Sequence, residues 1–222
     1  GDSAFSAVDD VMPTAYGEAW DILGTTTTGG VALETAVAKK GRIAGTATEN
    51  MMSYNNSSLV DGLSVTASYV PSNATQKESV VSLALAYTGV EGLTVGYAQD
   101  DNGLAGTSAI DYDTMYVKYA YGPVTAGYQQ SSQDANGSTN DDEFTAMGVT
   151  YAVSDSLSIG YTVSEYDDDN NTADEESTSI NFSYTMGSMT LAGAHVTVDN
   201  QGADSAAIND TSGYALDLSF AF

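Results

Sequence analysis

Residues 214–222 read YALDLSFAF, and this stretch decides the fold because its residues alternate in character. Large apolar side chains occupy every second position: Tyr214, Leu216, Leu218, Phe220 and Phe222. Neighbouring side chains of a strand point to opposite faces, so a period of two predicts a strand with one apolar face and one wet face. An apolar outward face that continues to a terminal aromatic residue favours a transmembrane β-barrel over a soluble sandwich.

The composition narrows the possible functions. The 222 residues include 30 acidic and 5 basic side chains, so the formal net charge is −25. Nucleic acid is a poor candidate partner, because phosphate binding requires the Lys and Arg that are scarce here. The absence of Cys excludes disulfides, thiolate metal sites and cysteine nucleophiles. No stretch approaches the roughly 18 apolar residues of a membrane helix, so strands would have to make any membrane crossing.

The same alternation recurs along most of the chain and predicts an all-β, antiparallel up-and-down barrel. We predict eleven strands, at residues 46–55, 63–70, 79–88, 92–99, 111–121, 123–131, 143–152, 156–166, 176–186, 188–198 and 213–222. The connections alternate between tight turns and longer polar loops. This asymmetry is typical of outer-membrane barrels, whose periplasmic turns are short.

The two faces of the predicted strands differ in chemistry. The apolar faces tend to finish on Tyr, which predicts two aromatic girdles at the membrane boundaries. Tyr54, Tyr87, Tyr119, Tyr151 and Tyr184 are expected near the turns, and Tyr69, Tyr97, Tyr128 and Tyr161 near the loops. The opposite faces carry Ser, Thr, Gly, Ala and Asn. Side chains so small and polar predict the water-filled lumen of a wide barrel.

Residues 50–63, NMMSYNNSSLVDGL, resemble a pattern of the general bacterial porins: an Asn, a Tyr four residues later, then a Ser-rich turn leading to Gly and an apolar residue. The last strand, ending on Phe222, is similar to the porin signal for the barrel-assembly machinery. The resemblance implies a homotrimer of sixteen-stranded barrels whose third loop folds into the pore. Residues 1–45 would then be the end of strand five plus this constriction loop, and residues 46–222 strands six to sixteen. We expect the first five strands in a separate or unreported segment, because open sheet edges are costly in lipid.

The resemblance also implies a constriction where acidic loop residues face a basic wall. Its acidic candidates here are Asp9, Asp10, Glu18, Asp21 and Glu34, and its basic candidates at the return to the wall are Lys39, Lys40 and Arg42. Lys118 is a further candidate, because Met115 and Val117 take the lipid face and turn Lys118 into the lumen. The alternative for Lys118 is a side chain that snorkels at a strand end.

The predicted outer loops are rich in carboxylates, which should concentrate cations at the channel mouth. Asp167, Asp168 and Asp169 offer hard oxygen ligands that would suit Ca²⁺ or bridge lipopolysaccharide phosphates through divalent ions. Their spacing does not match an EF-hand loop. We expect no required cofactor.

Catalysis has little support in the sequence, because His195 is the only His and the carboxylates lie mainly in loops. The sequence is therefore interpreted as a porin of the Gram-negative outer membrane. It would pass small hydrophilic solutes passively, prefer cations, and contact outer-membrane lipid. The first alternative is an acidic extracellular β-protein, an adhesin or filament subunit that binds Ca²⁺ through its loops. A second alternative is an outer-membrane β-barrel enzyme.

Overall fold

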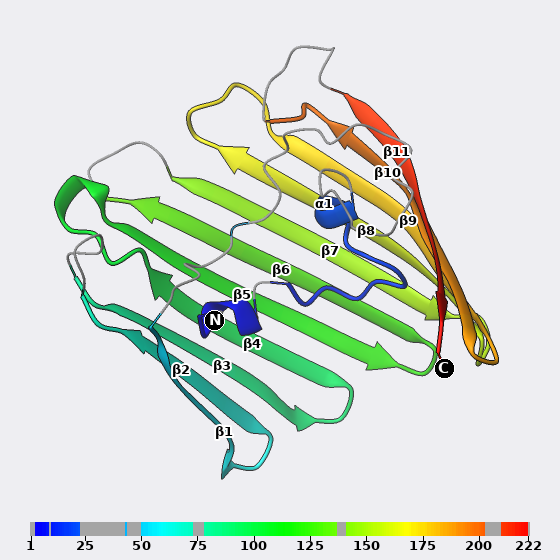
Figure 1. The fold of residues 1–222 in the computed structure, drawn as a ribbon, viewed down its shortest axis with the longest axis horizontal. Coiled ribbons are helices and arrows are strands. Elements are labelled where there is room, and N and C mark those ends of the chain that lie inside the picture. The colour runs from blue at the N-terminus through cyan, green and yellow to red at the C-terminus, as the bar shows by residue number, and fades with distance from the viewer. Residues whose placement is uncertain are drawn as a thin grey trace.

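The computed structural model describes residues 3–8, 10–22, 43, 50–72, 78–136, 141–202 and 210–221. These residues form one antiparallel sheet of eleven strands, in which neighbours in the chain are neighbours in space (Figure 1). The strands are β1 (Met52–Val60), β2 (Leu63–Val70), β3 (Val80–Val90), β4 (Leu93–Asp101), β5 (Ile110–Tyr121), β6 (Val124–Ala135), β7 (Asp142–Ala152), β8 (Leu157–Asp168), β9 (Glu175–Met186), β10 (Met189–Asp199) and β11 (Thr211–Phe220). The predicted all-β, up-and-down topology is confirmed.

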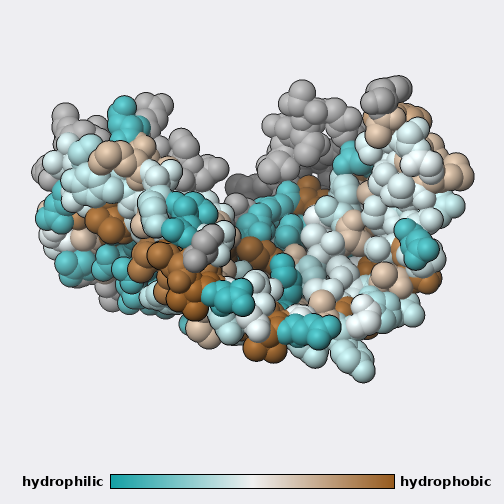
Figure 2. Space-filling view, turned by 90° about the horizontal axis from the view of Figure 1, so that it is seen from below, coloured by the Kyte–Doolittle hydropathy of each residue, from teal (hydrophilic) through white to brown (hydrophobic). Residues whose placement is uncertain are grey.

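Three short helical segments accompany the sheet. They are η1 (Phe5–Ala7), α1 (Ala19–Ile22) and η2 (Gly106–Ser108). None of the helices in the described residues has the length and apolar character needed to cross a membrane. The sheet itself is open within the described strands, because β1 and β11 each pair on one side only. It curves into a trough, and Figure 2 shows the hollow on one side of the molecule.

The connections alternate in length as the sequence predicts. Two-residue turns follow β1, β3, β5 and β9, and in each of them a Gly has positive φ: Gly62 at 76°, Gly92 at 75°, Gly122 at 56° and Gly187 at 60°. Glycine adopts this conformation without the steric penalty of a Cβ atom. A four-residue turn follows β7, and longer polar connections follow β2, β4, β6, β8 and β10.

The first hairpin differs from its prediction. A strand was predicted at residues 46–55 with a Ser-rich turn after it, but β1 spans Met52–Val60 and the turn is only Asp61 and Gly62. Val60 pairs with Leu63 across this turn. Gly62 permits a compact two-residue turn, so the Ser and Asn residues before it remain in the strand despite their preference for turns. Tyr54 is consequently near the loop end of β1, opposite Ala67, and does not join the girdle at the turns.

The convex face of the trough carries the predicted apolar rows. The exposed side chains on it include Tyr69, Tyr87, Tyr97, Met115, Val117, Tyr119, Met147, Val149, Tyr151, Ile159, Tyr161, Ile180 and Tyr184. Brown hydrophobic patches lie along this convex side in Figure 2. No second sheet covers these rows among the described residues. An apolar surface of this extent is typical of a wall that faces lipid.

The concave face carries small polar residues, as predicted, but water is not their only neighbour. Ser68, Ser82, Thr114, Thr162 and Ser179 are buried there. The amino-terminal residues lie across this face and form an apolar core with Tyr116, Phe144 and Tyr166. The expectation of a uniformly wet inner wall is therefore corrected, because these three large inward side chains support a second layer of chain.

His195 takes the outward register, which the sequence left open. Ala194 and Val196 are buried on the concave side of β10, so His195 between them points outward. Its ring lies 4.5 Å from the ring of Tyr214, measured between centroids.

Candidate functional site: the segment inside the trough

Residues 3–8 and 10–22, called here the inner segment, cross the concave face of the sheet (Figure 1). Three backbone N–H groups attach it to polar side chains of the wall. Ala4 N donates to Ser68 Oγ of β2 at 3.1 Å, and Ala15 N donates to Asn181 Oδ1 of β9 at 2.8 Å. Ala19 N donates to Thr162 Oγ1 of β8 at 3.1 Å. The segment therefore follows the wall across most of its width.

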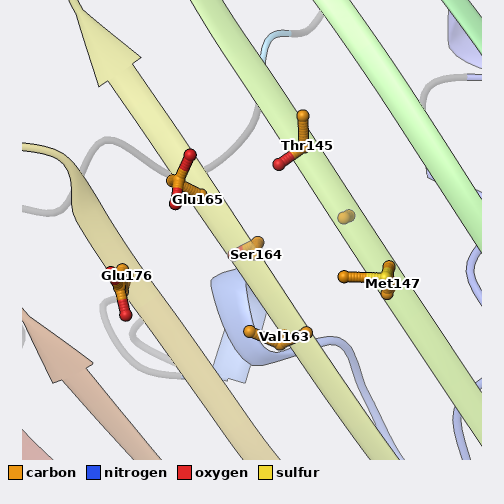
Figure 3. A pocket seen from close by; sticks show the side chains of 7 residues that line it. Thr145, Met147, Val163, Ser164, Glu165 and Glu176 are labelled. Carbon is orange, nitrogen blue, oxygen red and sulfur yellow. The ribbon is translucent and has the colours of Figure 1, made fainter.

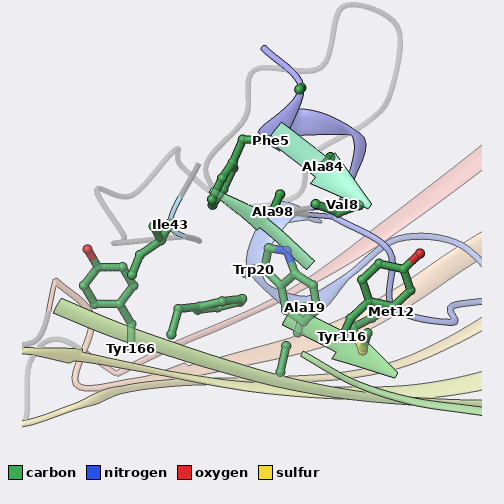
Figure 4. Packing of buried hydrophobic residues seen from close by; sticks show 13 residues of the cluster. Phe5, Val8, Met12, Ala19, Trp20, Ile43, Ala84, Ala98, Tyr116 and Tyr166 are labelled. Carbon is green, nitrogen blue, oxygen red and sulfur yellow. The ribbon is translucent and has the colours of Figure 1, made fainter. Parts of the chain in front are cut away.

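Apolar side chains hold the inner segment between these bonds. Trp20 of α1 is buried and meets Phe144 of β7 edge to face, with ring centroids 5.3 Å apart. Phe5 of η1 meets Tyr112 in the same manner at 6.4 Å. Figure 4 shows Ile43 close to Tyr166 in this cluster. Burying such aromatic surfaces stabilises the docked segment.

Tyr16 attaches the inner segment to the last strand. Its phenol donates a short hydrogen bond to the Asp217 carboxylate of β11. Burial, this hydrogen bond and the negative charge of Asp217 raise the pKa of Tyr16 to about 12. The phenol therefore stays protonated and bonded across the physiological pH range.

Three of the five acidic residues predicted for the constriction come together. Asp10, Glu18 and Asp21 each place a carboxylate oxygen so that the three atoms lie within 4.8 Å of one another. Carboxylates this close form a strongly negative site that suits a cation, including a hard divalent ion such as Ca²⁺. Asp9 and Glu34 lie outside the described residues.

Lys118 is the only Lys or Arg among the described residues. It lies on the concave face, and its Nζ donates to the carbonyl oxygen of Val11 in the inner segment at 3.4 Å. The alternation along β5 gave this direction, and the snorkelling alternative does not fit it. Lys39, Lys40 and Arg42 lie outside the described residues.

The predicted loop ligands do not converge. Asp168 is buried and accepts hydrogen bonds from Asn170 N at 2.9 Å and Asn171 Nδ2 at 2.8 Å, whereas Asp167 and Asp169 are exposed. Alternation at the end of β8 separates Asp167 from Asp168, and Asp169 lies beyond the strand. Within the described part of the chain, Asp10, Glu18 and Asp21 form the one group of three such ligands this close together.

The predicted assembly signal forms the outer face of β11. Tyr214, Leu216, Leu218 and Phe220 are all exposed on the convex side. Phe222 lies outside the described residues.

Sequence reasoning missed the residues that receive the inner segment. Gly127, Gly148 and Gly160 lie beneath Pro13–Ala15, and Asn181 beside them binds Ala15. The signal was present, because Gly inside a strand often marks the close approach of another backbone. The inward Phe144 and Tyr166 also break the polar row and could have suggested a docked layer.

A hollow of about 150 Å³ lies between β7 and β9. Figure 3 shows Met147 and Val163 at its apolar end and Glu165 and Glu176 at its acidic end, with α1 behind the strands. Met147 and Glu165 are exposed, so the hollow lies on the convex face. Its lining contains no His, and it has no part in the inner site.

Comparisons with known proteins agree with this architecture. The family model described as Gram-negative porin matches residues 1–204. No curated protein matches the sequence. The structure is similar to the anion-selective porin from Comamonas acidovorans, with a TM-score of 0.61 and 15% identity over 84% of this chain and 64% of that one. The chain thus spans just under two thirds of that porin.

Two other solved structures are similar in fold. OmpF of Salmonella typhi, in complex with daunomycin, gives a TM-score of 0.60 and 13% identity, covering 82% of this chain and 64% of that one. OmpT, an outer-membrane protein of Vibrio cholerae, gives a TM-score of 0.57 and 14% identity, covering 92% of this chain and 74% of that one. The extent of the family match carries the conclusion: the chain belongs to the Gram-negative porin family and is a protein of the bacterial outer membrane.

Proposed function

We propose that this chain forms the wall and the constriction of a water-filled channel for passive diffusion of small hydrophilic solutes and ions. The observation that carries the proposal is the pairing of an apolar convex wall with a polar concave wall on which an acidic segment lies. Lipid would contact the first surface and water the second. A porin family member with this arrangement fits a channel better than an enzyme.

We also propose a preference for cations. Asp10, Glu18 and Asp21 lie together in the inner segment, and the net charge of −25 surrounds the channel with negative potential. Lys118 would supply a positive charge on the wall beneath the segment, where its Nζ donates to the carbonyl oxygen of Val11. The similar porin from Comamonas acidovorans is anion-selective, so the preference of this chain is argued from its own charges.

The assembly we propose is a homotrimer. OmpT of Vibrio cholerae, which has a similar fold, is known in a trimer form. Further proposed partners are outer-membrane lipid around the convex wall, lipopolysaccharide at the acidic loops through divalent ions such as Ca²⁺, and the barrel-assembly machinery at β11.

Planar-bilayer recording tests the channel and its selectivity together. Purified outer-membrane protein should give stepwise conductance in KCl, and a salt gradient should give a reversal potential of the sign for cation flow. The Asp21→Asn variant should move this potential toward zero. The control is Thr185→Ala, at an exposed position near the turn end of β9, which should leave the potential unchanged. Absence of channels from folded protein would refute the function. A reversal potential for anion flow would refute only the selectivity.

A further inference from the structure

We propose that Gly127, Gly148 and Gly160 are positioning residues that set the distance between the inner segment and the wall, and so the free width of the channel. This inference rests on the proposed channel function. It concerns three neighbouring strands, β6, β7 and β8, where the backbone of the segment lies directly against the sheet.

The first contact is between Pro13 and a pair of facing glycines. Gly127 and Gly148 are direct partners in the β6–β7 ladder. A Cβ atom at Gly127 would lie 2.7 Å from Cδ of Pro13, and one at Gly148 would lie 2.5 Å from the carbonyl oxygen of Pro13. Both distances are shorter than the roughly 3.5 Å of ordinary contact. Pro13 therefore rests on the backbone of the sheet, with no side chain between them.

The second contact depends on Gly160 and Asn181. A Cβ atom at Gly160 would overlap Oδ1 of Asn181 and lie 3.0 Å from N of Ala15. Asn181 is 1% exposed, and its Oδ1 is the acceptor for Ala15 N. The missing side chain at Gly160 is thus what allows Asn181 to reach the segment.

The position of the segment follows from these contacts. Proline fixes its own φ, so the chain at Pro13 cannot bend easily around an obstacle. A methyl group at Gly148 would have to move the Pro13 carbonyl by about 1 Å to restore ordinary contact. That movement is directed away from the wall and into the lumen, where it would reduce the cross-section available to ions.

Two alanine substitutions distinguish this geometry from a general effect on folding. Gly127→Ala conflicts with the ring of Pro13 and with the flexible Met12 side chain, whereas Gly148→Ala conflicts with the Pro13 backbone. Pro13→Ala removes the ring and leaves the carbonyl. We expect Gly127→Ala to lower the unitary conductance and the Gly127→Ala, Pro13→Ala double variant to restore it. Gly148→Ala should lower the conductance with or without Pro13→Ala.

Unitary conductance is measured in planar bilayers. Folding of each protein is first confirmed by gel electrophoresis, in which heating should change the migration of a folded barrel. Val149→Ala, on the outward face of β7, is the matched control and should leave the conductance unchanged. Wild-type conductance in both glycine variants would overturn the inference while the channel function stands. Should Gly127→Ala fail to fold, restoration of folding by Pro13→Ala supports the contact, and failure to restore it overturns the inference. A wild-type protein without channels would instead refute the proposed function.

Discussion

Tyr16 connects the inner segment to the last strand through a single phenol, and the contact spans 201 positions in sequence. The alternation of β11 places Asp217 on the inner face and so predicts its direction. It does not predict its partner, because nothing local in the sequence relates residue 16 to residue 217. The same holds for Asn181 and Ala15. Single inward residues were therefore foreseeable, whereas their contacts depend on where a distant segment lies.

The Tyr16–Asp217 bond predicts a pH dependence at high pH. The folded pKa of Tyr16 is about 12 against an ordinary value of 10.0, so the unfolded chain loses this proton first. The contribution of Tyr16 to stability is complete below pH 10 and is lost as the pH rises from 10 to 12. We expect the difference in urea midpoint between wild type and Tyr16→Phe to shrink over that interval. A difference in midpoint that stays constant to pH 12 would contradict the raised pKa of Tyr16. Titration of the other tyrosines does not affect this difference, because both proteins contain them.

The inner segment behaves as an element whose position depends on tertiary packing. Its helices η1 and α1 have three and four residues and are too short to be stable alone. The resemblance to porins gave the inward fold, and the sequence supplied Asp10, Glu18 and Asp21 as its acidic residues. Their meeting within 4.8 Å depends on how the segment docks on the wall, with Trp20 buried and Tyr16 bonded to Asp217, and the periodicity of the sequence does not predict it.

Trp20 provides an optical test of this packing, because it is the only Trp in the chain. The Trp20 side chain is 1% exposed and packs against Phe144. Its fluorescence emission should therefore be blue-shifted and resistant to quenching by acrylamide. Phe144→Ala removes the supporting ring, at a cost of about 3–5 kcal/mol for a buried site. We expect that variant to shift the emission to the red and to increase quenching. Ile159→Ala on the exposed face is the control, and equal quenching in all three proteins would exclude the docked arrangement.

Alanine substitutions in two of the short turns should differ in how much they destabilise the fold. Gly122 and Gly62 both have positive φ, but a Cβ atom at Gly122 meets nothing within 4 Å, whereas one at Gly62 lies 2.6 Å from the backbone of Gly89. Gly122→Ala should cost about 1–2 kcal/mol from its conformation alone. Gly62→Ala should cost more because the backbone must also move. The folded fraction after refolding in detergent measures this order, and equal yields would contradict it.

The arrangement of strands in the whole sheet was predicted from the sequence more accurately than the individual contacts were. Ten of the eleven strands lie near their predicted bounds, because lipid on one side and a polar lumen on the other impose a period of two. Only the first strand was displaced, where Gly62 permits a tighter turn than the Ser-rich stretch suggested. The wall residues that receive the inner segment were harder to foresee, since only a few inward aromatic residues such as Phe144 interrupt the polar row.

The acidic charge predicts how selectivity responds to salt. The Debye length falls from ~10 Å at 0.1 M salt to ~3 Å at 1 M, so loop carboxylates act on permeating ions only at low salt. We expect the cation-to-anion permeability ratio to fall toward unity as KCl rises over this range. The diffusion of a neutral sugar into liposomes should not change. A ratio independent of salt would place the selectivity in the Asp10, Glu18 and Asp21 group alone.

The length of the inner segment bears on the shape of the wall. Twelve residue steps separate Ala4, bonded to β2, from Tyr16, bonded to β11, and nine strand spacings separate those two strands. A fully extended chain of that length reaches about 40 Å, and nine spacings along a sheet cover about 43 Å. The extended backbone is therefore shorter than the arc, so flattening the sheet would stretch the segment between its two bonds and unwind η1. The width of the lumen and the curvature of the sheet thus depend on each other. A deletion within residues 4–16 would increase the curvature of the sheet.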